Sequence, residues 1–195
     1  MLSLKDSLVV LKKTKALLEG HFILSSGLHS SKYVQCAKLL SHPHLSKNIC
    51  ISLSKKIKKE FKKFDLILAP AMGGVVIGYE IGRLLNKETI FCERVNGKFT
   101  LRRGFKIRKG TKVLIVEDVI TTGKSSLECT KIVTENKSQL AGFACIIDRS
   151  NAECLIKEKI ISQIKIDIKT FHKNDLPKHL KNLPAEKPGS RNINK

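Results

Sequence analysis

Two adjacent carboxylates and a small polar loop follow an apolar run, at Glu117-Asp118 and at Thr121 to Ser125. The run Val113 to Val116 has the continuous β-branched and leucine pattern of a strand buried on both faces of a parallel sheet. Open α/β sheets bind ligands at the carboxyl ends of their strands. The loop offers hydroxyls and backbone N–H groups to a phosphate at a helix N-terminus. Carboxylates that suit vicinal hydroxyls or Mg²⁺, beside such an anion cradle, predict a site for a ribose phosphate.

The triplet Gly123-Lys124-Ser125 also matches the end of a Walker A loop, which binds nucleoside triphosphates. That motif requires a glycine five positions before Gly123, where this chain has Asp118. A carboxylate there would face the triphosphate instead of cradling it. An acidic residue near a helix N-terminus can also simply interact with the helix dipole, without binding a ligand. Two adjacent acids followed by Thr-Thr-Gly favour the ribose phosphate interpretation over both alternatives.

A second group of charges lies in the segment ERVNGKFTLRRGF, residues 93–105, around the strong hairpin turn signal Asn96-Gly97. Its cations are Arg94, Lys98, Arg102 and Arg103. Cations gathered in this way suit pyrophosphate, through charge-assisted hydrogen bonds. The alternative is an exposed, solvated hairpin. The abundance of arginine disfavours it, because the whole chain has 30 lysines and only seven arginines.

Two further strand ends carry candidate site residues. Residues 69–74 (APAMGG) form a glycine turn after an apolar strand, and its backbone can approach a diphosphate without obstruction by side chains. A plain tight turn into a helix explains this segment equally well. Arg149 follows the apolar run 140–147, and an arginine there can form a fork onto a planar carboxylate. The alternative for Arg149 is a salt bridge with Asp148 or Glu153.

The order of strand, Glu-Asp, two aliphatic residues and Thr-Thr-Gly resembles the phosphoribosyl diphosphate (PRPP) motif of the type I phosphoribosyltransferases. The family often has a small residue or a second glycine at the position of Lys124. Over residues 20–148 the chain resembles the orotate-specific branch of that family, mainly through the hood element Ser-Gly-x-x-Ser-x-x-Tyr. The segments that carry this resemblance are Gly20-His21-Phe22, Ser26-Gly27-Leu28-His29-Ser30, Lys32-Tyr33-Val34-Gln35, Pro70-Ala71-x-Gly73-Gly74, Glu93-Arg94 and Leu101-Arg102-Arg103-Gly104-Phe105.

The resemblance implies that Glu117 and Asp118 bind the ribose hydroxyls of PRPP, that Thr121 also lies near orotate, and that Arg149 contacts orotate. The implied reaction is orotate plus PRPP giving orotidine 5′-monophosphate and pyrophosphate, with Mg²⁺ on the diphosphate. The full PRPP-binding set implied by the motif is Glu117, Asp118, Val119, Ile120, Thr121, Thr122, Gly123, Lys124 and Ser125.

The hairpin at residues 93–105 corresponds in this resemblance to a mobile catalytic loop that reaches across a homodimer to the partner's site. One branch of the family reads Arg-Lys-x-x-Lys-x-His in this loop, and this hairpin contains no histidine. The resemblance therefore leaves open which of Lys98, Arg102 and Arg103 is essential.

Strand and helix patterns alternate from Pro43 to Asp148, which predicts an α/β fold with an open parallel sheet and helices on both faces. We expect one domain over residues 1–195. Residues 1–40, starting with a helix over residues 4–19, and the alternating strand 160–168 would form a small hood over the carboxyl ends of the central strands. A partly helical stretch is expected at residues 151–159. Residues 186–195 lack an apolar anchor and are expected to be disordered.

The chain has 195 residues, 42% of them hydrophobic, which is ordinary for a globular domain. No apolar run approaches the roughly 18 residues of a membrane span, and the amphipathic N-terminus is expected to fold as a helix and not to act as a signal peptide. The six cysteines and six histidines show neither Cys-x-x-Cys pairs nor metal-ligand spacing. We therefore expect reduced thiols, a cytoplasmic location and no metal site built by these residues.

A formal net charge of +20 raises the possibility of a nucleic-acid partner. The lysines are scattered over presumed helix surfaces, whereas readers of nucleic acid favour arginine. We therefore expect no specific nucleic-acid partner. Two alternatives stay open: a type I phosphoribosyltransferase for another base, and an RNA-binding regulator built on the same fold.

Overall fold

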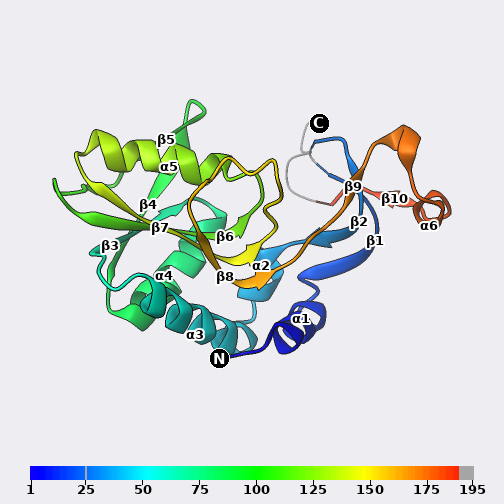
Figure 1. The fold of residues 1–195 in the computed structure, drawn as a ribbon, viewed down its shortest axis with the longest axis horizontal. Helices are drawn as coiled ribbons and strands as arrows, with labels where there is room; N and C mark the ends of the chain where they lie inside the picture. The colour runs from blue at the N-terminus through cyan, green and yellow to red at the C-terminus, as the bar shows by residue number, and fades with distance from the viewer. Residues whose placement is uncertain (25, 189–195) are drawn as a thin grey trace.

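The computed structural model describes residues 1–24 and 26–188, which form two β-sheets with helices packed around the larger one (Figure 1). Within these residues the larger sheet has the strand order β5-β4-β3-β6-β7-β8. Its strands are β3 (Leu66–Pro70), β4 (Glu88–Val95), β5 (Lys98–Leu101), β6 (Lys112–Ile120), β7 (Gln139–Asp148) and β8 (Ile160–Lys165). Neighbouring strands are parallel except β4 and β5, which form an antiparallel hairpin. The predicted open parallel α/β sheet is confirmed.

Helices cover both faces of this sheet, as the alternation of strand and helix patterns predicted. Helices α3 (Pro43–Glu60) and α4 (Gly73–Leu85) lie on one face, and α5 (Lys124–Glu135) lies on the other (Figure 1). Successive side chains of a strand point to opposite faces of the sheet. In β6, Leu114 accordingly joins the core formed with α3 and α4, whereas Ile115 joins the core formed with α5. Both faces of β6 are therefore buried away from water, which explains its unbroken apolar run.

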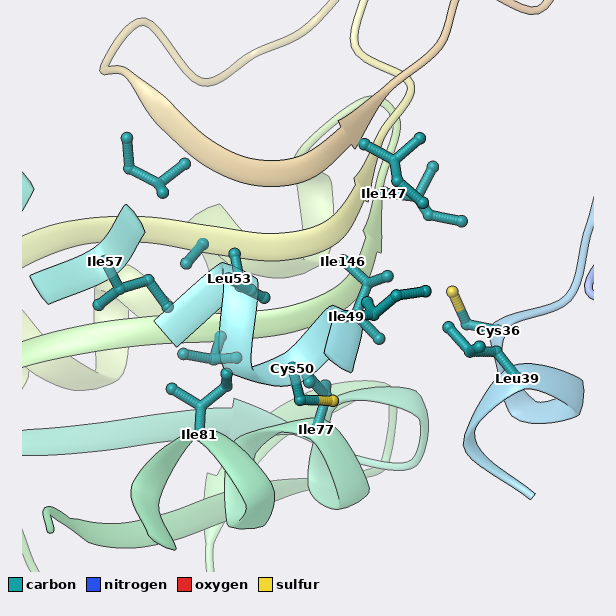
Figure 2. Close-up of a cluster of buried hydrophobic side chains, with 14 of the residues drawn as sticks. Cys36, Leu39, Ile49, Cys50, Leu53, Ile57, Ile77, Ile81, Ile146 and Ile147 are labelled. Atoms are coloured by element: carbon teal, nitrogen blue, oxygen red, sulfur yellow. The ribbon is translucent and has the colours of Figure 1, made fainter. Parts of the chain in front are cut away.

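Figure 2 shows the core between the sheet and helices α3 and α4. Ile49, Leu53 and Ile57 recur every four residues along α3 and are fully buried on one face of that helix. They meet Ile77 and Ile81 of α4 in the same cluster. Complete burial of one such side chain stabilises the fold by about 1.5–3 kcal/mol. This packing fixes the position of α4, and with it the glycine turn that precedes the helix.

The smaller sheet is the predicted hood, and it has the strand order β10-β1-β2-β9. Its strands are β1 (Leu17–Ile23), β2 (His29–Val34), β9 (Thr170–Phe171) and β10 (Ala185–Glu186). The prediction that residues 160–168 belong to this hood is wrong. Residues 160–165 form β8 and pair in parallel with β7 at the edge of the larger sheet, where Ile161 and Ile164 are buried.

The first helix, α1 (Leu4–Lys13), is shorter than predicted. The hydroxyl of Thr14 donates hydrogen bonds to the carbonyls of Val10 and Leu11, and Lys15 has a left-handed φ of 54°. This backbone ends the helix, and Leu17 pairs with Val34 in β1 and β2. The apolar residues after Lys13 thus serve a strand, although their spacing also fitted a helix.

The remaining helical segments are α2 (Cys36–Leu40), a 3₁₀ turn (Lys173–Asp175) and α6 (Lys178–Lys181). Residues 151–159 contain turns and bends and no helix, so the prediction for that stretch is wrong. Glu186 was expected in a disordered tail, yet it lies in β10 and pairs with Phe22 of β1. Residues 189–195 of that tail lie outside the described residues. No helix in the described part of the chain has both the length and the apolarity to cross a bilayer.

Candidate active site

A pocket of about 1010 Å³ opens between the carboxyl ends of β6 and β7, the turn before α5, and the hood. Strand ends of an open α/β sheet are where ligands of such folds bind. One continuous part of its wall comes from the predicted PRPP motif: Glu117, Val119, Ile120, Thr121, Thr122, Gly123, Lys124 and Ser125. Arg149 contributes from the end of β7, so the structure brings the predicted base-binding arginine and the motif together.

The turn before α5 has the geometry of an anion cradle. Gly123 has a φ of +73°, and a β-carbon there would lie 2.6 Å from Cγ1 of Ile156, so this position requires glycine. The first backbone hydrogen bond of α5 runs from the N–H of Leu127 to the carbonyl of Gly123. The N–H groups of Lys124, Ser125 and Ser126 thus precede the helical ladder, at the positive end of the helix dipole.

Glu117 and Asp118 lie within β6, which runs on to Ile120, and not after the strand as predicted. Their side chains therefore point to opposite faces of the sheet. Glu117 is only 9% exposed and accepts a hydrogen bond of 3.0 Å from the hydroxyl of Ser126. Burial raises the pKa of Glu117 to about 7; the Ser126 hydrogen bond and Arg94 act in the opposite direction, and Asp118 adds to the rise.

Asp118 points toward the glycine turn between β3 and α4 and does not line the pocket itself. Its Oδ1 accepts a hydrogen bond of 2.9 Å from the N–H of Val119. Burial raises the pKa of Asp118, and backbone hydrogen bonds oppose that rise. The turn itself, Pro70 to Gly73, contains a cis peptide bond between Ala71 and Met72. The acidic pair thus divides its two carboxylates between the pocket and the glycine turn.

Arg149 does not form the salt bridge that was the alternative explanation for it. Its backbone N–H donates to the carbonyl of Ile120, and its Nε is buried without a hydrogen-bond partner among the described residues. Burial lowers the pKa of Arg149, and Tyr33 of the hood raises it. Asp148 instead contacts Lys165 at 3.6 Å and accepts from the N–H of Ser150. A guanidinium in this state suits a ligand that brings a carboxylate.

The basic hairpin of β4 and β5 turns at Asn96-Gly97 as predicted, but none of its four cations lines the pocket of its own chain. The hairpin lies at the β5 edge of the larger sheet and projects beyond α5 (Figure 1). Arg103 forms two hydrogen bonds of 3.0 Å with Glu93. Arg94 forms an ion pair of 2.7 Å with Glu128 and stacks over Phe99.

Lys98 and Arg102 form no hydrogen bond through their side chains and no ion pair with any described residue. Among the four predicted catalytic residues, two are thus held by glutamates and two are not. The structure therefore brings Glu117, the turn before α5 and Arg149 together in one pocket, whereas Arg94, Lys98, Arg102 and Arg103 do not line it.

The hood closes the pocket, and part of that closure was not predicted. Tyr33 and Gln35, from the predicted hood element, line the pocket, as do Lys187 and Pro188 near the C-terminal end of the described chain. The imidazole of His21 holds this segment, because its Nδ1 lies 3.0 Å from the carbonyl oxygen of Leu183 and its Nε2 contacts His29 at 2.7 Å. A two-residue strand such as β10 carries no periodicity, so the sequence offered no signal for it.

Comparison with known proteins agrees with this geometry. The model of the phosphoribosyl transferase domain matches residues 37–181, which span β3 to β9 and include the whole PRPP motif. This chain belongs to the phosphoribosyl transferase family. The family match begins after β2 and ends before β10, so part of the hood lies outside the phosphoribosyl transferase domain model.

A curated relative supports the same family. A protein named orotate phosphoribosyltransferase from Parvibaculum lavamentivorans is 44% identical over 183 residues, which cover 93% of this chain and 94% of the relative. Among solved structures, orotate phosphoribosyltransferase from Aeropyrum pernix superposes with a TM-score of 0.70 at 23% identity, over 81% of this chain and 92% of that one. Adenine phosphoribosyltransferase from Thermoanaerobacter pseudethanolicus gives 0.60 at 19% identity, over 69% and 88%. The type I phosphoribosyltransferase fold is therefore shared by relatives named for different bases.

Proposed function

We propose that this chain is an orotate phosphoribosyltransferase, which transfers the 5-phosphoribosyl group from PRPP to orotate and yields orotidine 5′-monophosphate and pyrophosphate for pyrimidine biosynthesis. The observation that carries the proposal is the meeting in one pocket of Glu117, the turn before α5, and Arg149. A ribose phosphate accounts for the first two, and a base that bears a carboxylate accounts for the third. The 44% identity to a relative named for this activity supports the same substrate.

The ribose phosphate end of PRPP fits the wall formed by β6 and α5. The carboxylate of Glu117 accepts hydrogen bonds from the vicinal ribose hydroxyls. The backbone N–H groups at the start of α5 and the hydroxyls of Thr121, Thr122 and Ser125 hold the 5′-phosphate. Lys124, the first residue of α5, lines the same wall and adds a positive charge.

The base fits between the hood and Arg149. The guanidinium of Arg149 forms a planar fork, and the carboxylate of orotate is a planar acceptor that satisfies two of its N–H groups at once. Such a ligand supplies the counter-charge that this half-buried arginine lacks within the described chain. Adenine carries no carboxylate, so Arg149 favours orotate over a purine.

The reaction joins a ring nitrogen of orotate, which loses its proton, to the anomeric carbon of PRPP as the bond from that carbon to pyrophosphate breaks. Positive charge develops on the ribose and negative charge on the leaving pyrophosphate. The hood excludes water from the electrophilic sugar, and cations stabilise the leaving group. No covalent intermediate with a protein nucleophile is needed.

The cations for pyrophosphate come from the hairpin of a second copy of the chain, in a homodimer. Two observations support this assembly. None of the four hairpin cations lines the pocket of its own chain, and the side chains of Lys98 and Arg102 have no hydrogen-bond or ion-pair partner in the described chain. Three apolar residues on α4 and at its start offer a surface for the partner. Met72, Val76 and Tyr79 recur on one side of the helix and are 83%, 54% and 67% exposed.

The donor set fits Mg²⁺ only when the ion binds together with the substrate. The described residues contain no group of three or more His, Cys, Asp or Glu side chains placed to hold a metal ion. Mg²⁺ is commonly bound by one or two carboxylates together with substrate phosphates. Asp118, beside the glycine turn, is the carboxylate placed to assist in this way. When bound, the ion would neutralise charge on the leaving diphosphate.

The proposal includes a cytoplasmic location, and the state of the thiols supports it. All six cysteines are free and buried, which agrees with a reducing compartment. The partners of the proposal are thus orotate, PRPP and a second copy of the chain, without a specific nucleic acid or a membrane.

A base-specificity panel tests the proposal. The purified protein is incubated with PRPP and Mg²⁺ and with orotate, uracil, adenine or hypoxanthine in separate reactions, and nucleotide formation is measured by chromatography. We expect orotidine 5′-monophosphate from orotate and no nucleotide from the other bases. Turnover of adenine or hypoxanthine would move the chain to another branch of the family. Tight, salt-dependent RNA binding with no turnover of any base would indicate a regulator instead.

A further inference from the structure

Ser126 links the two halves of the proposed PRPP site. It is the third residue of α5, is 1% exposed, and lines the pocket together with Glu117 of β6. Its Oγ donates to Oε1 of Glu117 at 3.0 Å, across the junction between helix and strand. The predicted PRPP-binding residues ended at Ser125, so no role was predicted for Ser126.

The direction of the Ser126 hydroxyl is unusual for a helical serine in this chain. Ser54 of α3 donates to the carbonyl of Ile51 at 2.9 Å, and the half-buried Thr130 of α5 donates to the carbonyl of Ser126 at 3.2 Å, so both bonds stay within one helix. Ser126 donates to a carboxylate on a neighbouring strand instead. This hydrogen bond therefore holds the carboxylate of Glu117 and does not satisfy a carbonyl of the helix.

Glu117 depends on this bond for its orientation. Ser126 is the one side chain that forms a hydrogen bond with the Glu117 carboxylate in residues 1–24 and 26–188. Arg94 influences Glu117 only through charge, because the Arg94 guanidinium is engaged by Glu128. An alanine at position 126 would occupy the same buried position but would form no hydrogen bond with the Glu117 carboxylate.

We propose, on the basis of the proposed function, that Ser126 is a positioning residue for PRPP, which fixes the ribose-binding carboxylate of Glu117 relative to the phosphate-binding start of α5. Ribose 5-phosphate spans both elements, so its affinity depends on their spacing. Ser126 itself does not need to touch the substrate.

The effect is expected on PRPP binding more than on turnover. Glu117 contacts ribose hydroxyls that are present both before and during the reaction, so loss of its alignment weakens uniform binding. Ser126→Ala should raise the KM for PRPP about 10- to 100-fold, the cost of one hydrogen bond to a charged group. The kcat and the KM for orotate should change less than about twofold. Ser126→Thr, which keeps the hydroxyl, should restore the KM for PRPP.

A double-mutant cycle with Glu117→Ala tests the proposal directly. The dissociation constant of ribose 5-phosphate is measured by calorimetry for the wild type, both single variants and the double variant. Ser126→Ala should weaken binding in the wild-type background and have no effect when Glu117 is already alanine. Ser54→Ala is the matched control, because it removes another buried helical hydroxyl, and it should leave binding unchanged.

Equal effects of Ser126→Ala in both backgrounds would overturn the proposal, and so would an unchanged dissociation constant in the wild-type background. Thermal melting of each variant separates these results from a loss of folding. If the Ser126→Ala protein is too unstable to assay, Ser126→Thr is measured instead. Weaker binding of ribose 5-phosphate by Ser126→Thr than by the wild type would also count against the proposal. Ribose 5-phosphate binding needs no turnover, so absence of orotate turnover in the wild type would contradict the proposed function separately.

Discussion

The carboxylate of Asp118 lies directly against the Cα of Gly73, so that a β-carbon at position 73 would be 2.7 Å from Oδ1 of Asp118. This contact joins the end of β6 to the start of α4, two segments that are 45 positions apart in the sequence. Gly73 also has an ordinary helical role as the first residue of α4. Its lack of a side chain thus serves the acidic pair and not the backbone conformation.

Gly73→Ala should impair catalysis more than folding. The new methyl group must displace the Asp118 carboxylate, which is held by the N–H of Val119. We expect kcat/KM for PRPP to fall at least about tenfold, as a small misplacement of a substrate-binding group can do. The melting temperature should fall by only a few degrees, because the methyl group adds no cavity to the core. Steady-state kinetics gives kcat/KM, and thermal melting gives the melting temperature. An unchanged kcat/KM would mean that Asp118 has no role in the site.

The raised pKa of Glu117 predicts a pH dependence of stability. The folded-state pKa of about 7 lies above the ordinary value of 4.5, so the native state binds the proton more tightly than the unfolded chain between these two values. Glu117 therefore costs stability as the pH rises from 4.5 to 7, with the full cost reached above 7. Glu117→Gln removes this ionisation and should be the more stable protein at pH 8, by up to about 3 kcal/mol.

Urea denaturation of both proteins at pH 5 and pH 8, without substrate or divalent ions, measures this effect. The difference in unfolding free energy between Glu117→Gln and the wild type should grow from pH 5 to pH 8. A difference that stays constant over this range would mean that Glu117 titrates near its ordinary pKa. Thr134→Ala, on the exposed side of α5, is a control whose effect should not depend on pH.

Arg149 should discriminate between the two substrates. Arg149→Ala is expected to raise the KM for orotate about 10- to 100-fold, the cost of losing charge-assisted hydrogen bonds to a carboxylate. The KM for PRPP should change less than about threefold. Arg149→Lys should recover part of the loss at most, because an ammonium group lacks the planar fork. Arg108→Ala, which removes an exposed arginine that does not line the pocket, is the control; equal effects on both substrates would place Arg149 elsewhere.

The hairpin should act on the pocket of the partner subunit. The double variant Lys98→Ala/Arg102→Ala and the variant Asp118→Asn should each be nearly inactive as pure homodimers. After denaturation and refolding together in equal amounts, half of the dimers combine one chain of each kind. Each mixed dimer then has one intact pocket facing one intact hairpin, so about one quarter of the wild-type activity should return. No recovery in a mixture shown to contain mixed dimers would mean that each hairpin serves its own pocket.

Sequence patterns predicted the larger sheet well because its physics is local. The apolar run 113–116 is buried on both faces of β6, and Asn96-Gly97 forms the hairpin turn that its residue types require. The Thr-Thr-Gly turn before α5 is likewise set by one glycine with a positive φ. Of the predicted PRPP-binding residues, Glu117 and residues 119–125 accordingly line one pocket, whereas Asp118 does not, and their roles stay a prediction.

Other features depend on contacts between distant segments, which periodicity does not contain. Residues 160–165 alternate as a strand should, but only packing decides that they join β7 and not the hood. The hood gains β9 and β10 instead, each two residues long. Leu18 fitted the helical spacing of the N-terminal segment, but it lies in β1 and pairs with Tyr33 of β2. The absence of the basic hairpin from the pocket wall is also a property of the whole sheet, because β5 lies at its edge.

The measurement that tests the central claim most directly is the loss of orotate absorbance on addition of PRPP and Mg²⁺ to the purified wild-type protein, with pyrophosphate release followed in the same reaction. The account predicts that orotate is consumed and pyrophosphate is released in equal amounts, and that Arg149→Ala slows both at low orotate concentration. A folded wild-type protein that consumes no orotate under these conditions would contradict it.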